Sequence, residues 1–147
     1  MEINLKEYND DQLECIDNRM YIKSSKKLLT GIQIEYHKNG NVKRRIEFKN
    51  GVLDGVVENF REDGKLKHME TWKDKDLHGF TKTYDEKYGS VSTGFFNNRH
   101  ESGEWDTYDK NGVLVAKLVF DGKGNLFSKI ENKNEEYYKI FQFDKKE

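Results

Sequence analysis

The stretch GIQIEYHKNGNVKRRIEF, residues 31–48, decides the fold. Apolar and polar side chains alternate over residues 32–36, and apolar positions of a single parity return over residues 42–48. Between them stands the turn sequence Lys38-Asn39-Gly40-Asn41. Alternation of period two on both sides of an Asn-Gly pair is the strongest short-range signal of a β-hairpin. The stretch therefore predicts two antiparallel strands joined by a tight turn.

This hairpin pattern recurs every 24 residues. Each copy opens with a glycine and carries aromatic residues five and 17 positions after it. With aromatics at 13% of positions, eight blind matches have a probability on the order of 10⁻⁷ before allowance for the search. The repeat residues are the glycines Gly31, Gly55, Gly79 and Gly103, the first aromatics Tyr36, Phe60, Tyr84 and Tyr108, and the second aromatics Phe48, Trp72, Phe96 and Phe120. The repeat predicts hairpins that bury their apolar side chains against their neighbours.

The expected fold class is all-β, an elongated antiparallel β-sheet of repeated hairpins with terminal caps. Residues 1–147 form one repeat domain in this interpretation. Its parts are an N-terminal cap and half-repeat (1–30) with an Asp-Asn turn, four hairpins (31–126), and a C-terminal cap strand or hairpin (127–147). Gly89 comes one residue late in the third unit, which predicts a longer loop or a bulge there. For residues 4–15, a short amphipathic helix is left as an alternative prediction.

The composition favours a thin sheet over a thick core. Charged residues make 36% of the chain, hydrophobic residues 34%, and mean hydropathy is -1.03. Aromatic residues bury a large area each, so one aromatic sheet face with a large solvated surface accounts for these values. The net charge of -1 gives no field that selects nucleic acid or anionic membrane. The chain lacks a signal-peptide pattern and any apolar stretch of membrane-spanning length, so a cytoplasmic location is expected.

No catalytic or metal-binding pattern stands out. The four histidines are scattered singly, whereas a zinc site needs three or four converging ligands. Cys15 has no neighbouring base and lies beside Ile16, so a buried structural thiol is expected rather than a nucleophile. The sequence therefore predicts a non-enzymatic protein without cofactor or metal.

On the second strand of each hairpin, alternate side chains are expected to lie on the face opposite the repeat aromatics. These side chains become more apolar toward the C-terminus. Lys43, Arg45 and Glu47 are charged at these positions, whereas the third unit has Val91, Thr93 and Phe95 and the fourth has Val115, Lys117 and Val119. Large exposed apolar patches are rarely left bare, so something is expected to cover this side. One cover is the C-terminal segment, folded back as a cap through Phe127, Ile130, Tyr137, Tyr138, Ile140, Phe141 and Phe143.

The other cover is a partner protein. Phe95 and Trp105 are aromatic anchors of the kind that dominate interfaces, and Tyr88 lies in the lengthened loop. These three residues are the candidate partner-binding residues, and packing under the C-terminal segment is the alternative role for them.

The pattern of glycine, aromatic, turn glycine and second aromatic resembles the MORN repeat in its bacterial variant form, over roughly residues 13–126. It resembles in particular the YwqK-like proteins, commonly labelled as the antitoxin half of a toxin–antitoxin pair. That resemblance implies a protein-interaction module that binds a partner protein, such as a cognate toxin, through its sheet surface or edge. A peripheral lipid- or glycan-binding sheet is the alternative that the resemblance to MORN proteins implies.

Overall fold

The computed structural model describes residues 4–133 and 136–142 and contains β-strands as its regular elements, with one 3₁₀ turn. The predicted all-β class is confirmed. The chain divides into two compact units, Met1–Asp76 (unit one) and Leu77–Glu147 (unit two). The short strand β9 (Asp76–Leu77) lies at the division between them.

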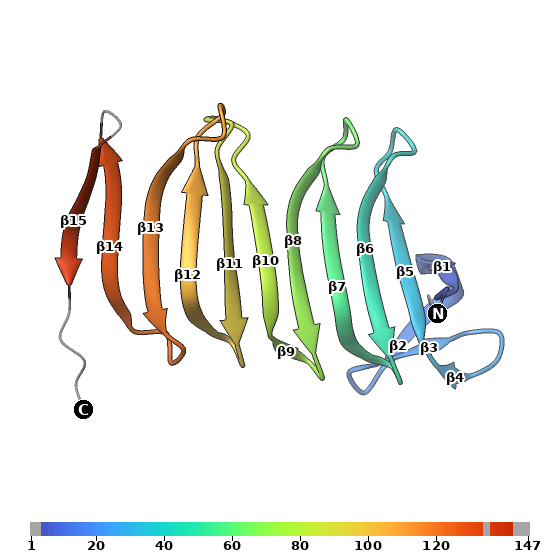
Figure 1. Ribbon diagram of the computed structural model, residues 1–147. Coiled ribbons are helices and arrows are strands. Elements are labelled where there is room, and N and C mark those ends of the chain that lie inside the picture. Colours follow the sequence, from blue (N-terminus) through green and yellow to red (C-terminus); the bar gives the residue numbers. More distant parts are fainter. Residues whose placement is uncertain (1–3, 134–135, 143–147) are drawn as a thin grey trace. The chain divides into compact units, whose positions relative to one another are not determined.

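Unit one contains a sheet with the strand order β1-β5-β6-β7-β8 and a small separate sheet of β2, β3 and β4 (Figure 1). Strand β1 runs parallel to β5, and the other pairs are antiparallel. The strands are β1 (Glu7–Asn9), β2 (Leu13–Ile16), β3 (Arg19–Ile22), β4 (Lys27–Leu28), β5 (Gly31–Tyr36), β6 (Val42–Lys49), β7 (Val52–Phe60) and β8 (Leu66–Lys73). In place of the helix left open over 4–15, the chain forms only the 3₁₀ turn η1 (Asp10–Gln12) between two strands.

Unit two contains an antiparallel sheet in which strands follow in chain order from β10 to β15 (Figure 1). These strands are β10 (Gly79–Tyr84), β11 (Val91–Asn97), β12 (His100–Tyr108), β13 (Leu114–Asp121), β14 (Leu126–Lys133) and β15 (Glu136–Gln142). The C-terminal segment extends the sheet, because β14 pairs with β13 and β15 pairs with β14. The expectation that this segment folds back over a sheet face was wrong for residues 126–133 and 136–142, and Phe143 lies outside the described residues.

The connections explain why the chain reverses where it does. Each repeat hairpin closes with a loop: residues 37–41, 61–65 and 109–113, and a loop one residue longer at 85–90, as predicted. Two-residue turns join successive hairpins at Asn50-Gly51, Asp74-Lys75 and Asn98-Arg99, with positive φ at both positions. This is the turn geometry that matches the natural twist of paired strands. Asp17-Asn18 forms the same turn in the predicted half-repeat.

The strand register places the two aromatic series on opposite faces of each sheet. Residues directly opposite in an antiparallel pair point to the same side. Tyr36 lies opposite Val42, but Gln33 lies opposite Ile46, because a bulge shifts the register between Glu35 and Tyr36. The same shift recurs beside the loops at 61–65 and 109–113. The interpretation of one aromatic face, with Val42 beside Ile46 and Phe48, was therefore wrong.

We call these surfaces the Tyr face, which carries the first aromatic of each repeat, and the Trp face, which carries the second. Each of the two large sheets is a single layer of strands (Figure 1). Most repeat aromatics are half-buried, and Tyr36 is exposed. The most buried apolar side chains in the described residues all lie in unit one: Leu13, Leu29, Ile32, Ile34, Ile46 and Val57.

Candidate functional site

An exposed aromatic pair lies on the Tyr face of unit two. Phe95 on β11 is opposite Phe80 on β10, and the two rings meet edge to face with centroids 5.6 Å apart. The Phe95 side chain is 52% exposed, which is unusual for a large apolar residue in a strand interior. We call Phe80 and Phe95 the aromatic patch.

Charged side chains stand beside the aromatic patch on the same face. Thr93 lies opposite Asp106, and Asp106 lies opposite Lys117. The Lys117 ammonium group is 2.7 Å from Glu104 Oε2 and 2.9 Å from Asp106 Oδ1. Hydrogen bonds from Lys117 to Glu104 and then to Asp106 raise the pKa of Lys117 above its usual 10.5. The aromatic patch is therefore bordered by the paired charges of Lys117, Glu104 and Asp106.

Trp105 lies on the opposite face from Phe95. Its ring covers Gly94 and makes edge-to-face contacts with Phe96 and Phe120, at centroid distances of 5.0 and 6.1 Å. Its Nε1 donates a hydrogen bond to the Phe95 carbonyl oxygen at 3.2 Å. Phe95 and Trp105 were predicted to share a face because both aromatic series were assigned to one face, and that prediction was wrong. Trp105 is a packing residue of the Trp face.

Tyr88 lies at the tip of the 85–90 loop and is 66% exposed. Its backbone N–H donates to Asp85 Oδ1 at 2.7 Å, and Lys87 Nζ lies 4.8 Å from the centre of its ring. The aromatic patch lies toward the other end of the β10–β11 hairpin, where Phe80 follows the first residue of β10. Of the three predicted partner-binding residues, Phe95 and Tyr88 are exposed at separate places, and Trp105 faces away from Phe95.

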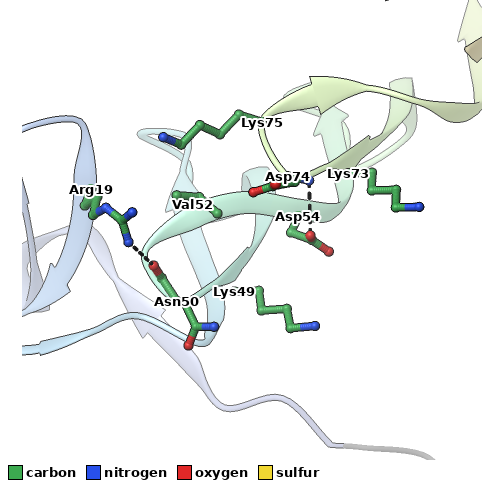
Figure 2. Close-up of a pocket in the computed structure, with 8 residues that line it drawn as sticks. All are labelled: Arg19, Lys49, Asn50, Val52, Asp54, Lys73, Asp74 and Lys75. Atoms are coloured by element: carbon green, nitrogen blue, oxygen red, sulfur yellow. Dashed lines mark hydrogen bonds between the residues drawn. The ribbon is translucent and has the colours of Figure 1, made fainter. Parts of the chain in front are cut away.

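Sequence reasoning missed a basic pocket in unit one, which we call the turn pocket (Figure 2). It has a volume of about 380 Å³ and lies at the turns that follow β6 and β8. Its lining holds four basic and two acidic side chains, in contrast to the chain's net charge of -1. The lining residues are Arg19, Lys49, Asn50, Val52, Asp54, Lys73, Asp74 and Lys75.

The residues considered for chemistry take structural roles or lie on the surface. His37 Nε2 is 3.0 Å from the Phe60 carbonyl oxygen, and His68 Nε2 is 3.0 Å from Glu70 Oε2. His78 Nδ1 accepts a hydrogen bond from the Asn98 N–H. Cys15 is exposed, so its predicted burial was wrong, since β2 pairs only with β3 in its small sheet and leaves Cys15 open.

Residues 4–133 and 136–142 contain no group of three or more His, Cys, Asp or Glu side chains placed to hold a metal ion. In the same residues, no helix has the length and apolar character needed to cross a membrane. His100 is exposed on the surface.

The hairpins, turns and single-layer sheets define a tandem β-hairpin repeat protein. Residues 29–50 and 53–74 each match the family model described as MORN repeat variant, so the chain contains two copies of that repeat. Both copies lie in unit one, and each spans one predicted hairpin. The MORN repeat variant is a structural repeat unit rather than a catalytic domain. A comparison with curated proteins found no match.

Proposed function

We propose that this chain is a non-enzymatic protein-interaction module that binds a partner protein through the Tyr face of unit two. The observation that carries the proposal is the aromatic patch, in which Phe95 is half exposed against Phe80. Interfaces concentrate binding energy in a few aromatic anchors surrounded by polar residues. The patch and the charges on Lys117, Asp106 and Glu104 have that composition.

We further propose that the partner is a toxin and that the chain neutralises it, as the resemblance to YwqK-like antitoxins suggests. A flat face of this kind would act by occlusion, covering the partner's own active surface. Binding by occlusion needs surface complementarity and no chemistry from the chain. This mechanism is compatible with a repeat whose residues mainly pack and hydrogen-bond within the sheet.

Affinity capture from the source organism with three versions of the full chain tests the proposal. The wild-type chain is compared with Phe95→Glu, which puts a charge into the aromatic patch, and with Tyr36→Glu as the control. Tyr36 is as exposed as Phe95 and belongs to the Tyr face of unit one, so it controls for loss of a surface aromatic. We expect one protein to be recovered with the wild-type chain and the control but lost with Phe95→Glu.

The recovered protein is then expressed alone and together with the chain. We expect it to inhibit growth alone, and we expect co-expression of the wild-type chain to restore growth. Recovery that is indifferent to Phe95→Glu would refute the assigned surface. A recovered protein that is harmless alone would refute the antitoxin role and leave the binding role in place.

A further inference from the structure

The chain contains three Asn-Gly pairs, and all three lie in the loops and turns that join strands. They are Asn39-Gly40, Asn50-Gly51 and Asn111-Gly112. An asparagine that precedes glycine is prone to deamidation, because no Cβ hinders the approach of the glycine nitrogen to the asparagine side chain. Since the residue that follows is the same in all three pairs, their intrinsic reactivity is similar. Differences between them come from the structure around each pair.

The first pair is protected by hydrogen bonds to its asparagine side chain. Asn39 Nδ2 donates to the Glu62 carbonyl oxygen at 2.7 Å, and Asn39 Oδ1 accepts from the Asn41 N–H at 2.9 Å. The Gly40 N–H donates to the His37 carbonyl oxygen at 3.0 Å. All three hydrogen bonds must open together before the Gly40 nitrogen can reach the side-chain carbonyl carbon of Asn39.

The second pair is protected by burial of its glycine. The Gly51 N–H donates to the Leu29 carbonyl oxygen at 2.7 Å, and the Gly51 carbonyl accepts from the Met20 N–H at 2.8 Å. Asn50 has a positive φ of 50°, and its N–H donates to Thr30 Oγ1 at 3.0 Å. The Gly51 nitrogen is therefore fixed to another segment and shielded from the water that must remove its proton.

The third pair is open to solvent. Asn111 and Gly112 are both exposed, and a Cβ built on Gly112 would meet nothing within 4 Å. Among the residues that the structure describes, the Asn111 side chain forms no hydrogen bond, although its backbone N–H donates to Asp109 Oδ1 at 2.8 Å. The Gly112 N–H donates to the Asp109 carbonyl oxygen at 3.0 Å, within the same loop. The reacting nitrogen is thus held by a local hydrogen bond at the surface.

We propose that Asn111 is the residue at which this chain deamidates in its folded state, a modification independent of partner binding. Water or hydroxide removes the proton from the Gly112 nitrogen, which bonds to the side-chain carbonyl carbon of Asn111. The side-chain nitrogen leaves as ammonia, and a succinimide ring remains. One water molecule then opens the ring at either of its two carbonyl carbons. The products are aspartate and isoaspartate, and in isoaspartate the main chain runs through the side-chain carbons.

The two products differ in their effect on the loop. Aspartate is compatible with it, because Asp63 holds the same position in the loop of the second repeat and accepts a backbone hydrogen bond there at 2.9 Å. Isoaspartate adds a carbon to the main chain and breaks the β-turn that the Gly112 N–H closes. Lys110 Cβ lies 3.0 Å from the position of a Cβ on Gly89, so the altered loop abuts the 85–90 loop.

Peptide mapping by mass spectrometry tests the proposal on the full chain, incubated in mildly alkaline buffer. All three pairs are measured in one sample. We expect Asn111 to react roughly tenfold faster than Asn39, because two additional hydrogen bonds of ordinary strength must open at Asn39. We expect Asn50 to react no faster than Asn39. An isoaspartyl methyltransferase labels the isoaspartate product, and the Asn111→Gln variant should lose most of that label.

The same chain unfolded in guanidinium chloride is the matched control. The native hydrogen bonds are absent there, so the three rates should come within about threefold of one another. A rate at Asn111 that is no higher than the rates at Asn39 and Asn50 in the folded chain would overturn the proposal. A preference for Asn111 that persists in the unfolded chain would also overturn it, because the cause would then be local sequence rather than the fold.

Discussion

Substitution of Gly94 by alanine should destabilise unit two, because the Trp105 ring occupies the space that a Cβ would need. Gly94 is buried, and a Cβ built on it would overlap the six-membered part of the indole. The ring would have to leave its place between Phe96 and Phe120 and give up its hydrogen bond to the Phe95 carbonyl. Each aromatic pair contributes about 0.5–1.5 kcal/mol and the hydrogen bond about 1 kcal/mol. Loss of all three lowers the free energy of unfolding by about 2–4 kcal/mol.

Urea denaturation followed by circular dichroism measures this cost, and a double-mutant cycle isolates its cause. In a Trp105→Leu background the indole is gone, so Gly94→Ala should then change the free energy of unfolding by less than about 0.5 kcal/mol. Trp105→Leu alone supplies the fourth corner of the cycle. If Gly94→Ala is neutral in the wild-type chain, or equally costly in both backgrounds, the proposed overlap with Trp105 is incorrect.

Two further outcomes are expected. Trp105→Ala should lower the free energy of unfolding by about 3 kcal/mol, whereas the half-exposed Phe95→Ala should lower it by no more than about 1 kcal/mol; urea denaturation that ranks them the other way would contradict their assigned faces. Because the folded-state pKa of Lys117 is raised, its stabilising effect is complete below pH 10.5 and is lost as pH rises through the folded-state pKa. The Lys117→Met variant should therefore lose less stability than the wild type between pH 10 and pH 12 in alkaline denaturation, and equal losses would count against the interaction with Glu104.

The period of the repeat was predictable because the signals that specify a hairpin are local. The Asn50-Gly51 turn could be located directly, since both residue types favour positive φ. Asp74-Lys75 and Asn98-Arg99 adopt the same backbone with no glycine at the second position, so their 24-residue spacing from Asn50-Gly51 is the clearer signal. The chain enforces the turn at these positions through the pairing of the strands on either side.

The faces of the sheet could not be predicted, because one bulge beside a loop reverses the parity of the residues beyond it. No residue type around Val42 marks the position of that bulge. Trp105 was assigned to the wrong face for the same reason. The turn pocket was missed for a different reason. Its charged side chains come from segments that are far apart in the sequence. In a chain with 26 basic residues, a single lysine cannot be told from ordinary solvated surface. The spacing of Lys49 and Lys73 before successive turns was the available signal.

The loop at 85–90 shows that one copy of the repeat can lengthen its hairpin loop while keeping its total length of 24 residues. The β10–β11 pair has no bulge beside this loop, so the residue that the other hairpins place in a bulge lies in the loop, and Val91 stays opposite Tyr84. A one-residue insertion inside β11 would instead move the following side chains of that strand to the opposite face of the sheet. The change is confined to the hairpin tip, where it leaves Tyr88 exposed.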